Sequence, residues 1–120
     1  MHLITRLATV AAFAVLAGCA SQSTVPPVPG KHLVYRDTNG QVIRQFTYPD
    51  DAFCRRVEKM AGRSARCQPD SATGMQAHAT LRYNPPGVLV EGHYANMERC
   101  RADTNSMSPG VQLVQPCTTQ

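Results

Sequence analysis

Met75-Gln-Ala-His-Ala-Thr-Leu-Arg-Tyr-Asn84 is the stretch that decides the fold. Apolar and polar residues alternate through it without a break, which is the period of a strand with one buried face. Pro and Gly at 85–87 predict a turn, and the apolar run from Val88 to Tyr94 returns the chain. The sequence therefore predicts an antiparallel hairpin, and either of two turn positions keeps the same side chains on the buried face.

The other face of this hairpin places His78 and His93 close together, with Glu91 beside them. Two imidazoles and a carboxylate can ligate zinc or copper, and coupled histidines can sense pH. Polar side chains on the solvated face of a sheet explain the same pattern, and neighbouring Arg82 repels a cation. We predict no metal or cofactor, and name these three residues as the candidate ligands if a metal binds.

Two elements are predicted on the N-terminal side. Residues 32–47 form a second hairpin, because Asn39-Gly40 between two apolar runs is the strongest short turn signal. A helix begins within residues 47–50, where capping and acidic residues suit the positive end of the helix dipole. This helix ends at Gly62, a residue that favours helix termination.

On the C-terminal side, residues 95–101 are predicted to extend the returning strand, and residues 111–115 form a last strand. The predicted fold class is α+β, with a small antiparallel sheet of four to five strands in the order β-β-α-β-β-β. One helix packs on a face of this sheet. A small closed barrel is the alternative architecture.

The predicted helix has two distinct faces at 100° per residue. Its apolar arc is expected to be buried and contains Phe53, Cys54, Val57, Met60 and Ala61. Its opposite arc is basic and contains Arg55, Arg56, Lys59 and Arg63. This basic face is either a plain solvated surface or a contact for anionic lipid, glycan or an acidic partner.

The first residues are typical of an export signal. Arg6 is followed by an uncharged run up to residue 17, and these eleven residues are too few to cross the ~30 Å hydrocarbon layer of a bilayer. The run ends in Leu16-Ala17-Gly18-Cys19, which resembles the lipobox of bacterial lipoproteins. The resemblance implies cleavage between Gly18 and Cys19 and acylation of Cys19, whose acyl chains then hold the chain on a membrane.

The location follows from the same resemblance. Lipoproteins kept at the inner membrane tend to have aspartate where this chain has Ala20, so the outer membrane is expected, facing the periplasm or the cell surface. The alternatives are that Cys19 is an ordinary cysteine behind a cleavable secretory signal, or that it is part of an unprocessed membrane helix. Residues 1–18 are thus predicted to be a signal peptide, residues 19–30 a Pro- and Ser-rich tether, and residues 31–120 a single periplasmic domain.

Four cysteines lie in this domain, at Cys54, Cys67, Cys100 and Cys117. An even number in an exported chain predicts two disulfides, whereas the lack of a C-x-x-C pair disfavours zinc. Short loops favour the pairs Cys54–Cys67 and Cys100–Cys117, and a hairpin turn in Ser-Pro-Gly at 108–110 suits the second pair. The other connectivities stay open.

Charge and motifs limit the classes of function. Without the signal, eleven Lys and Arg stand against eight Asp and Glu, a net charge of +3 that suits an anionic neighbour without implying nucleic acid. The chain lacks G-x-S-x-G, H-E-x-x-H and a phosphate-binding glycine loop, so we expect no enzyme. We predict a non-catalytic binding or accessory module of the cell envelope, whose partner is an envelope protein or the cell wall. The alternatives are an inhibitor or immunity protein that neutralises a periplasmic toxin or lysozyme, and a metal-binding or sensing domain.

Overall fold

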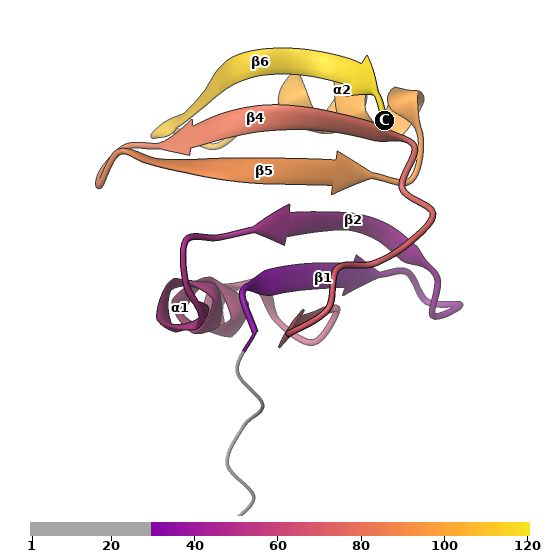
Figure 1. Cartoon of the computed structure of the whole chain (residues 1–120), viewed down its shortest axis with the longest axis horizontal. Coiled ribbons are helices and arrows are strands. Elements are labelled where there is room, and N and C mark those ends of the chain that lie inside the picture. The colour runs from indigo at the N-terminus through magenta and orange to yellow at the C-terminus, as the bar shows by residue number, and fades with distance from the viewer. Residues whose placement is uncertain (1–29) are drawn as a thin grey trace, which may run out of the picture.

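Six strands form one antiparallel sheet in the computed structural model, which describes residues 30–120 (Figure 1). In chain order the elements are β1 (His32–Arg36), β2 (Val42–Thr47), α1 (Asp51–Ala61), β3 (Ala65–Gln68), β4 (Ala77–Tyr83), β5 (Val88–Tyr94), α2 (Met97–Thr104) and β6 (Val111–Thr119). Across the sheet the strand order is β3-β1-β2-β5-β4-β6. The two edges are therefore the short strand β3 and the nine-residue strand β6.

The predicted α+β class and the central hairpin are confirmed. β4 pairs with β5 in the register that opposes Tyr83 to Val88 and Leu81 to Val90. This register corresponds to the earlier of the two turn positions that the sequence allows. The predicted buried face is kept, since Leu81, Val90 and Tyr94 are almost fully buried.

The N-terminal hairpin and the first helix also form where they are predicted. β1 and β2 pair across a turn in which Gly40 has a φ of 84°, a conformation that favours glycine. Asp50 caps α1, because its carboxylate accepts a hydrogen bond from the Phe53 N–H at 2.8 Å. α1 ends at Gly62, as the sequence indicates.

The prediction of four to five strands and one helix is wrong, because the described residues form six strands and two helices. The strand that the prediction omits is β3, whose four residues are too few to show alternation. Contacts distant in sequence hold it: β3 pairs with β1, and Cys67 within it is bonded to Cys54 of α1.

The expectation that residues 95–101 extend β5 is also wrong, because α2 begins there. The side-chain oxygen of Asn96 accepts a hydrogen bond from the Arg99 N–H at 2.8 Å, which caps the helix. Glu98 in the first turn suits the positive end of the helix dipole. Cys100 is fully buried, and it belongs to this helix and not to a strand.

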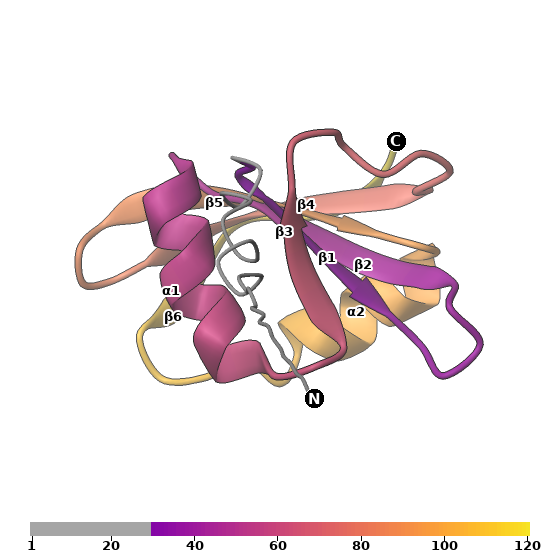
Figure 2. The same cartoon turned by 90° about the horizontal axis from the view of Figure 1, so that it is seen from below.

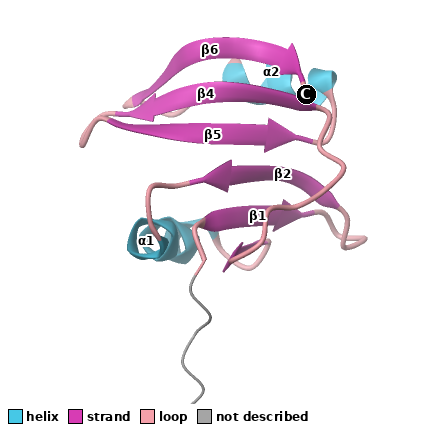
Figure 3. Cartoon of the chain, viewed as in Figure 1, coloured by secondary structure: helices cyan, strands magenta, loops and turns pink. Residues whose placement is uncertain are grey.

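The core lies between the sheet and the two helices, which pack on the same face (Figures 2 and 3). One cluster beside α1 includes Leu33 and Tyr48, and another beside α2 includes Ala79 and Tyr94. Phe46 of β2 contacts both clusters, and its ring centroid lies 6.1 Å from that of Tyr94. The two helices therefore share one continuous apolar layer.

Each helix is attached to the sheet by a disulfide. Cys54 of α1 is bonded to Cys67 of β3, and Cys100 of α2 is bonded to Cys117 of β6. These are the two pairs that the short loops favour. Because each bond joins a helix to an edge strand, both edges of the sheet are cross-linked to the layer above them.

The opposite face of the sheet is partly covered by residues 69–76. Gln45 is fully buried there: its side-chain oxygen accepts a hydrogen bond from the Ala72 N–H at 2.6 Å, and its amide donates to Ser71 Oγ at 3.1 Å. Hydrogen-bonding both ends of the amide compensates its burial. The half-buried His78 and His93 lie on the same face of the sheet.

Candidate functional site

The structure divides the predicted basic face of α1 into two pairs. Arg55 forms an ion pair within α1, and the guanidinium of Arg56 stacks over the Phe53 ring at 5.2 Å. Both of these arginines are therefore held against the surface of their own helix. Lys59, in the last turn of the helix, and Arg63, which follows its C-cap Gly62, are exposed.

Lys59 and Arg63 join two arginines that the sequence pattern does not single out. Arg66 of β3 lines a hollow of about 360 Å³ with both of them. Arg36, at the end of β1, lines an adjoining hollow of about 420 Å³ with Arg63 and Arg66. We call Arg36, Lys59, Arg63 and Arg66 the cationic patch. The sequence does not predict β3, the strand that contains Arg66. No local pattern therefore indicates that Arg66 lies near α1.

The carboxylates next to the cationic patch are engaged by the backbone. Glu58 accepts a hydrogen bond from the Cys67 N–H at 2.7 Å. Asp37 accepts hydrogen bonds from the N–H groups of Asn39 and Gln41 at 2.9 and 3.0 Å. Within the described part of the chain, no ion pair joins either carboxylate to the patch. The positive charge of the patch is therefore not neutralised by these neighbouring carboxylates through ion pairs.

The net charge of the domain lies in its first half. Residues 30–74 contain eight Lys and Arg against five Asp and Glu, whereas residues 75–120 contain three against three. The first half supplies β1, β3 and α1, which lie at one edge of the sheet (Figure 2). The chain enters the domain at this edge, where Gly30 packs against the backbone of Gln68 and Pro69.

Met60 belongs to α1, the helix that supplies Lys59 of the cationic patch. The prediction that it is buried is wrong, since it is 79% exposed, more than any other large apolar side chain of the described residues. The disulfide of Cys54 orients α1 on the sheet, and Met60 lies about 120° around the helix from Cys54. An exposed methionine therefore directly follows Lys59 in the sequence and precedes Arg63 by three positions.

The structure brings the two predicted histidines together. His78 and His93 are opposed in the β4–β5 ladder, with ring centroids 5.9 Å apart and ring planes at 28°. Their Nδ1 atoms are hydrogen-bonded to the side chains of Thr118 and Gln120. The Glu91 carboxylate instead accepts a hydrogen bond from a threonine hydroxyl of β4. In the described part of the chain, no three His, Cys, Asp or Glu side chains are arranged to hold a metal ion.

A third histidine, His32 of β1, lies on the same face of the sheet. Its Nδ1 atom is hydrogen-bonded to Thr47 Oγ1 at 2.8 Å. Burial lowers the pKa of His32 below its ordinary value of 6.5, the charges of Lys31 and His93 lower it further, and Asp70 opposes them. The neutral imidazole is therefore favoured in the folded chain.

Acidification is expected to destabilise the domain through His32. Because the folded chain binds this proton less readily than the unfolded chain, stability present above pH 6.5 is lost as the pH falls below that value. Thermal unfolding between pH 8 and pH 5 should show a smaller acid loss in His32→Gln than in the wild type. Lys31→Gln, which removes a neighbouring cation and keeps the imidazole, should also reduce the loss. An unchanged pH dependence in both variants would contradict this assignment.

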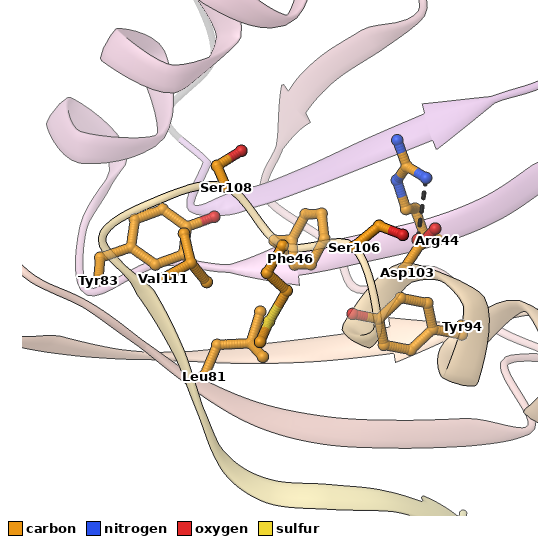
Figure 4. A pocket seen from close by; sticks show the side chains of 10 residues that line it. Arg44, Phe46, Leu81, Tyr83, Tyr94, Asp103, Ser106, Ser108 and Val111 are labelled. Carbon is orange, nitrogen blue, oxygen red and sulfur yellow. Dashed lines mark hydrogen bonds and ion pairs between the residues drawn. The ribbon is translucent and has the colours of Figure 1, made fainter.

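A pocket of about 230 Å³ lies between the sheet, α2 and the segment that joins α2 to β6 (Figure 4). Its apolar lining includes the rings of Phe46, Tyr83 and Tyr94 and the side chains of Leu81 and Val111. We call it the aromatic pocket. No sequence pattern predicts it, because its residues come from β2, β4, β5, α2 and β6.

Arg44 and Asp103 form the ion pair of the aromatic pocket, with Arg44 Nη1 2.9 Å from Asp103 Oδ2. The Arg44 guanidinium also stacks over the Tyr35 ring at 4.4 Å. Its Nε atom is buried and has no hydrogen-bond partner in the described part of the chain. Leaving a buried donor unsatisfied costs about 1–3 kcal/mol, so Arg44 Nε is a donor that gains from an added acceptor.

Two phenols also belong to the aromatic pocket. In Figure 4 the hydroxyls of Tyr83 and Tyr94 point inward from opposite ends. Burial raises the pKa of both above the usual value of 10, so both hydroxyls are protonated at neutral pH. The Tyr83 hydroxyl is also 3.0 Å from that of Tyr48.

The fold and these surfaces define a small, disulfide-bonded α+β domain with a cationic edge and an aromatic pocket. No family model, curated protein or solved structure matches the chain. Neither helix within residues 30–120 is long and apolar enough to cross a bilayer. Gly18 and Cys19 lie outside the described residues, so cleavage and acylation there stay predictions.

Proposed function

We propose that this chain is a lipid-anchored, non-catalytic binding module of the bacterial cell envelope. Acylated Cys19 holds it at the outer membrane, the cationic patch rests on anionic headgroups, and the opposite side of the domain meets an envelope protein or the cell wall. One observation carries the proposal: the patch and the entry of the chain at Gly30 share one edge of the sheet. An anchor that precedes Gly30 brings this edge toward the membrane.

Electrostatics favours this placement of the patch. Each Lys or Arg near an anionic membrane surface contributes about 1 kcal/mol, and the effect decays within a Debye length of about 10 Å at 0.1 M salt. Residues 19–30 can separate the lipid from the domain by at most roughly 40 Å, which keeps the local concentration of headgroups high. Four clustered cations then select one orientation of the domain.

Met60 strengthens the same contact. Helices that lie in the headgroup region carry both apolar and cationic side chains, so that the apolar groups enter the acyl boundary and the charges bind phosphates. Met60 is 79% exposed, and in the sequence it lies between Lys59 and Arg63 of the patch. Burial of its side chain at the bilayer surface removes apolar area from water.

This orientation leaves the far side of the domain free. β6 lies four strands from β1, which is roughly 19 Å at the usual spacing of about 4.8 Å. The edge that carries the cationic patch and the β6 edge are therefore distinct surfaces. This is expected of a module that lies on a membrane and binds a second component.

Membrane binding at two salt concentrations separates the anchor from the patch. The wild-type chain is expected to stay with membranes at about 1 M salt, because acyl chains are insensitive to screening. Full-length Cys19→Ser should bind vesicles containing about 30 mol% phosphatidylglycerol at about 0.1 M salt and leave them at about 1 M. Reversing Lys59, Arg63 and Arg66 to Glu in this background should weaken vesicle binding at least about 100-fold.

The matched control reverses Arg82, Arg99 and Arg101 to Glu, which changes the net charge equally but lies outside the patch. This control should still bind anionic vesicles, and none of the variants should bind vesicles of phosphatidylcholine alone. Release of the wild-type chain from membranes by salt would overturn the anchor. Equal losses in the two triple variants, or binding of Cys19→Ser only to an acidic protein, would overturn the membrane contact of the patch.

A further inference from the structure

The aromatic pocket shares no lining residue with the two hollows of the cationic patch. Phe46, Leu81 and Tyr94, from three neighbouring strands, line its base, and Tyr83 and Val111 line one end (Figure 4). Its volume of about 230 Å³ is below the ~300–1,000 Å³ of most small-molecule sites. A ligand that fits this space has a single ring.

The polar groups of the pocket indicate a neutral ligand. Arg44 is paired with Asp103, so the two charges that line the pocket compensate each other. Arg44 Nε lacks an acceptor but is shielded from water, so a ligand reaches it only if neighbouring side chains move, whereas the exposed residues Ser106 and Ser108 supply accessible hydroxyls. A carboxylate or an amine in this space would compete with the ion pair between Arg44 and Asp103. A carbonyl oxygen would instead supply the acceptor that Arg44 Nε lacks.

Aromatic rings next to such donors suit a sugar. A pyranose ring has apolar C–H faces that pack on aromatic side chains and a polar rim that exchanges hydrogen bonds with hydroxyls and guanidinium groups. An acetamido group adds a carbonyl acceptor of the kind that Arg44 Nε lacks.

We propose that the aromatic pocket binds one N-acetylated hexosamine ring, with the acetamido carbonyl accepting a hydrogen bond from Arg44 Nε. Met107 is the half-buried side chain that moves to admit the ring, since a methionine repacks readily. N-acetylated hexosamines occur in envelope glycans, so this site identifies a chemical class for the second component of the envelope module. The role of the sugar as the second component rests on the proposed function, whereas sugar binding by the pocket does not depend on the acylation of Cys19 or on the cationic patch.

Titration of the oxidised full-length chain with N-acetylglucosamine, followed by NMR, tests this site. A dissociation constant on the order of 1 mM is expected, with shifted amides confined to the strands and loop that line the pocket. Glucose, which lacks the acetamido group, should bind at least about 10-fold more weakly. No shifts up to about 20 mM sugar, or shifts confined to the cationic patch, would overturn the proposal.

Two substitutions of the same type on β6 provide the variant test. Val111→Phe fills the pocket and should weaken N-acetylglucosamine binding at least about 10-fold. Val114→Phe places the same ring on an exposed position outside the pocket and should bind like the wild type. Equal affinities of both folded variants would overturn the site. The map of shifted amides in the wild-type chain decides the question if Val111→Phe does not fold.

Discussion

The double variant Cys100→Ala/Cys117→Ala is expected to lose about 3 kcal/mol of unfolding free energy and all detectable sugar binding. The bond joins residues separated by 17 positions, and closing a loop of this size in the unfolded chain contributes about 3 kcal/mol. α2 has eight residues, too few for a stable isolated helix, and Cys100 is its buried residue. Without the bond, α2 loses its main attachment to β6.

The aromatic pocket depends on that attachment. α2 supplies Asp103, the partner of Arg44, and the segment after α2 supplies Met107. Displacement of α2 removes both groups and opens the pocket to water. Urea unfolding measures the loss of stability, and titration with N-acetylglucosamine, well below the melting temperature of the variant, measures the loss of binding.

The double variant Cys54→Ala/Cys67→Ala is the matched control. Its bond spans 13 positions, so its removal is also expected to cost about 3 kcal/mol. No residue of α1 lines the aromatic pocket, so this variant should still bind the sugar while it is folded. Equal loss of sugar binding in the two double variants would assign the effect to general destabilisation and contradict the role of α2.

The parts of the fold that the sequence predicts are those whose contacts are local. The alternation of residues 75–84 and the turn after it predict both the β4–β5 pairing and the approach of His78 to His93. Capping residues and Gly62 predict the two ends of α1. In each case the deciding residues lie within one hairpin or one helix.

The parts that the sequence does not predict depend on distant contacts or on one capping residue. β3 has four residues and is a strand because β1 and the disulfide to α1 hold it. At α2 the strand pattern stops when the Asn96 side chain caps a helix, and the low amphipathicity of residues 97–104 gives no periodic signal. The capping Asn96 and the acidic Glu98 in the first turn are the local signs of this helix.

The candidate sites are also predicted by the sequence only where their residues are close together in the chain. The basic face of α1 is visible in the helical periodicity, and it predicts Lys59 and Arg63 of the cationic patch. Arg36 and Arg66 join them only through the pairing of β1 with β3. The aromatic pocket draws on five elements, and the partner of Arg44 is 59 residues away in the sequence, so no local pattern can indicate it.

Gly30, where the chain enters the domain, packs against the end of the edge strand β3. A substitution at Gly30 therefore tests whether the entry segment is held at the edge that carries the cationic patch. A methyl group at this position would lie 2.2 Å from the Gln68 carbonyl carbon, 2.4 Å from its oxygen and 2.6 Å from the Pro69 nitrogen. All three atoms belong to the backbone, so no side-chain rotation relieves the overlap. Either the start of β1 or the end of β3 must move.

Gly30→Ala is therefore expected to destabilise the domain by about 3 kcal/mol, at the upper end of the usual cost of overpacking. The next residue, Lys31, accepts a hydrogen bond through its carbonyl from the N–H of Tyr48 at 2.9 Å, so movement of β1 reaches a fully buried core residue. Urea unfolding of the oxidised chain measures the effect. Lys31→Ala is the control, since it trims an exposed side chain and keeps that carbonyl, and it should stay within about 0.5 kcal/mol of the wild type. A Gly30→Ala chain as stable as this control would show that the entry segment does not pack against β3, and the shared edge on which the membrane orientation rests would be lost.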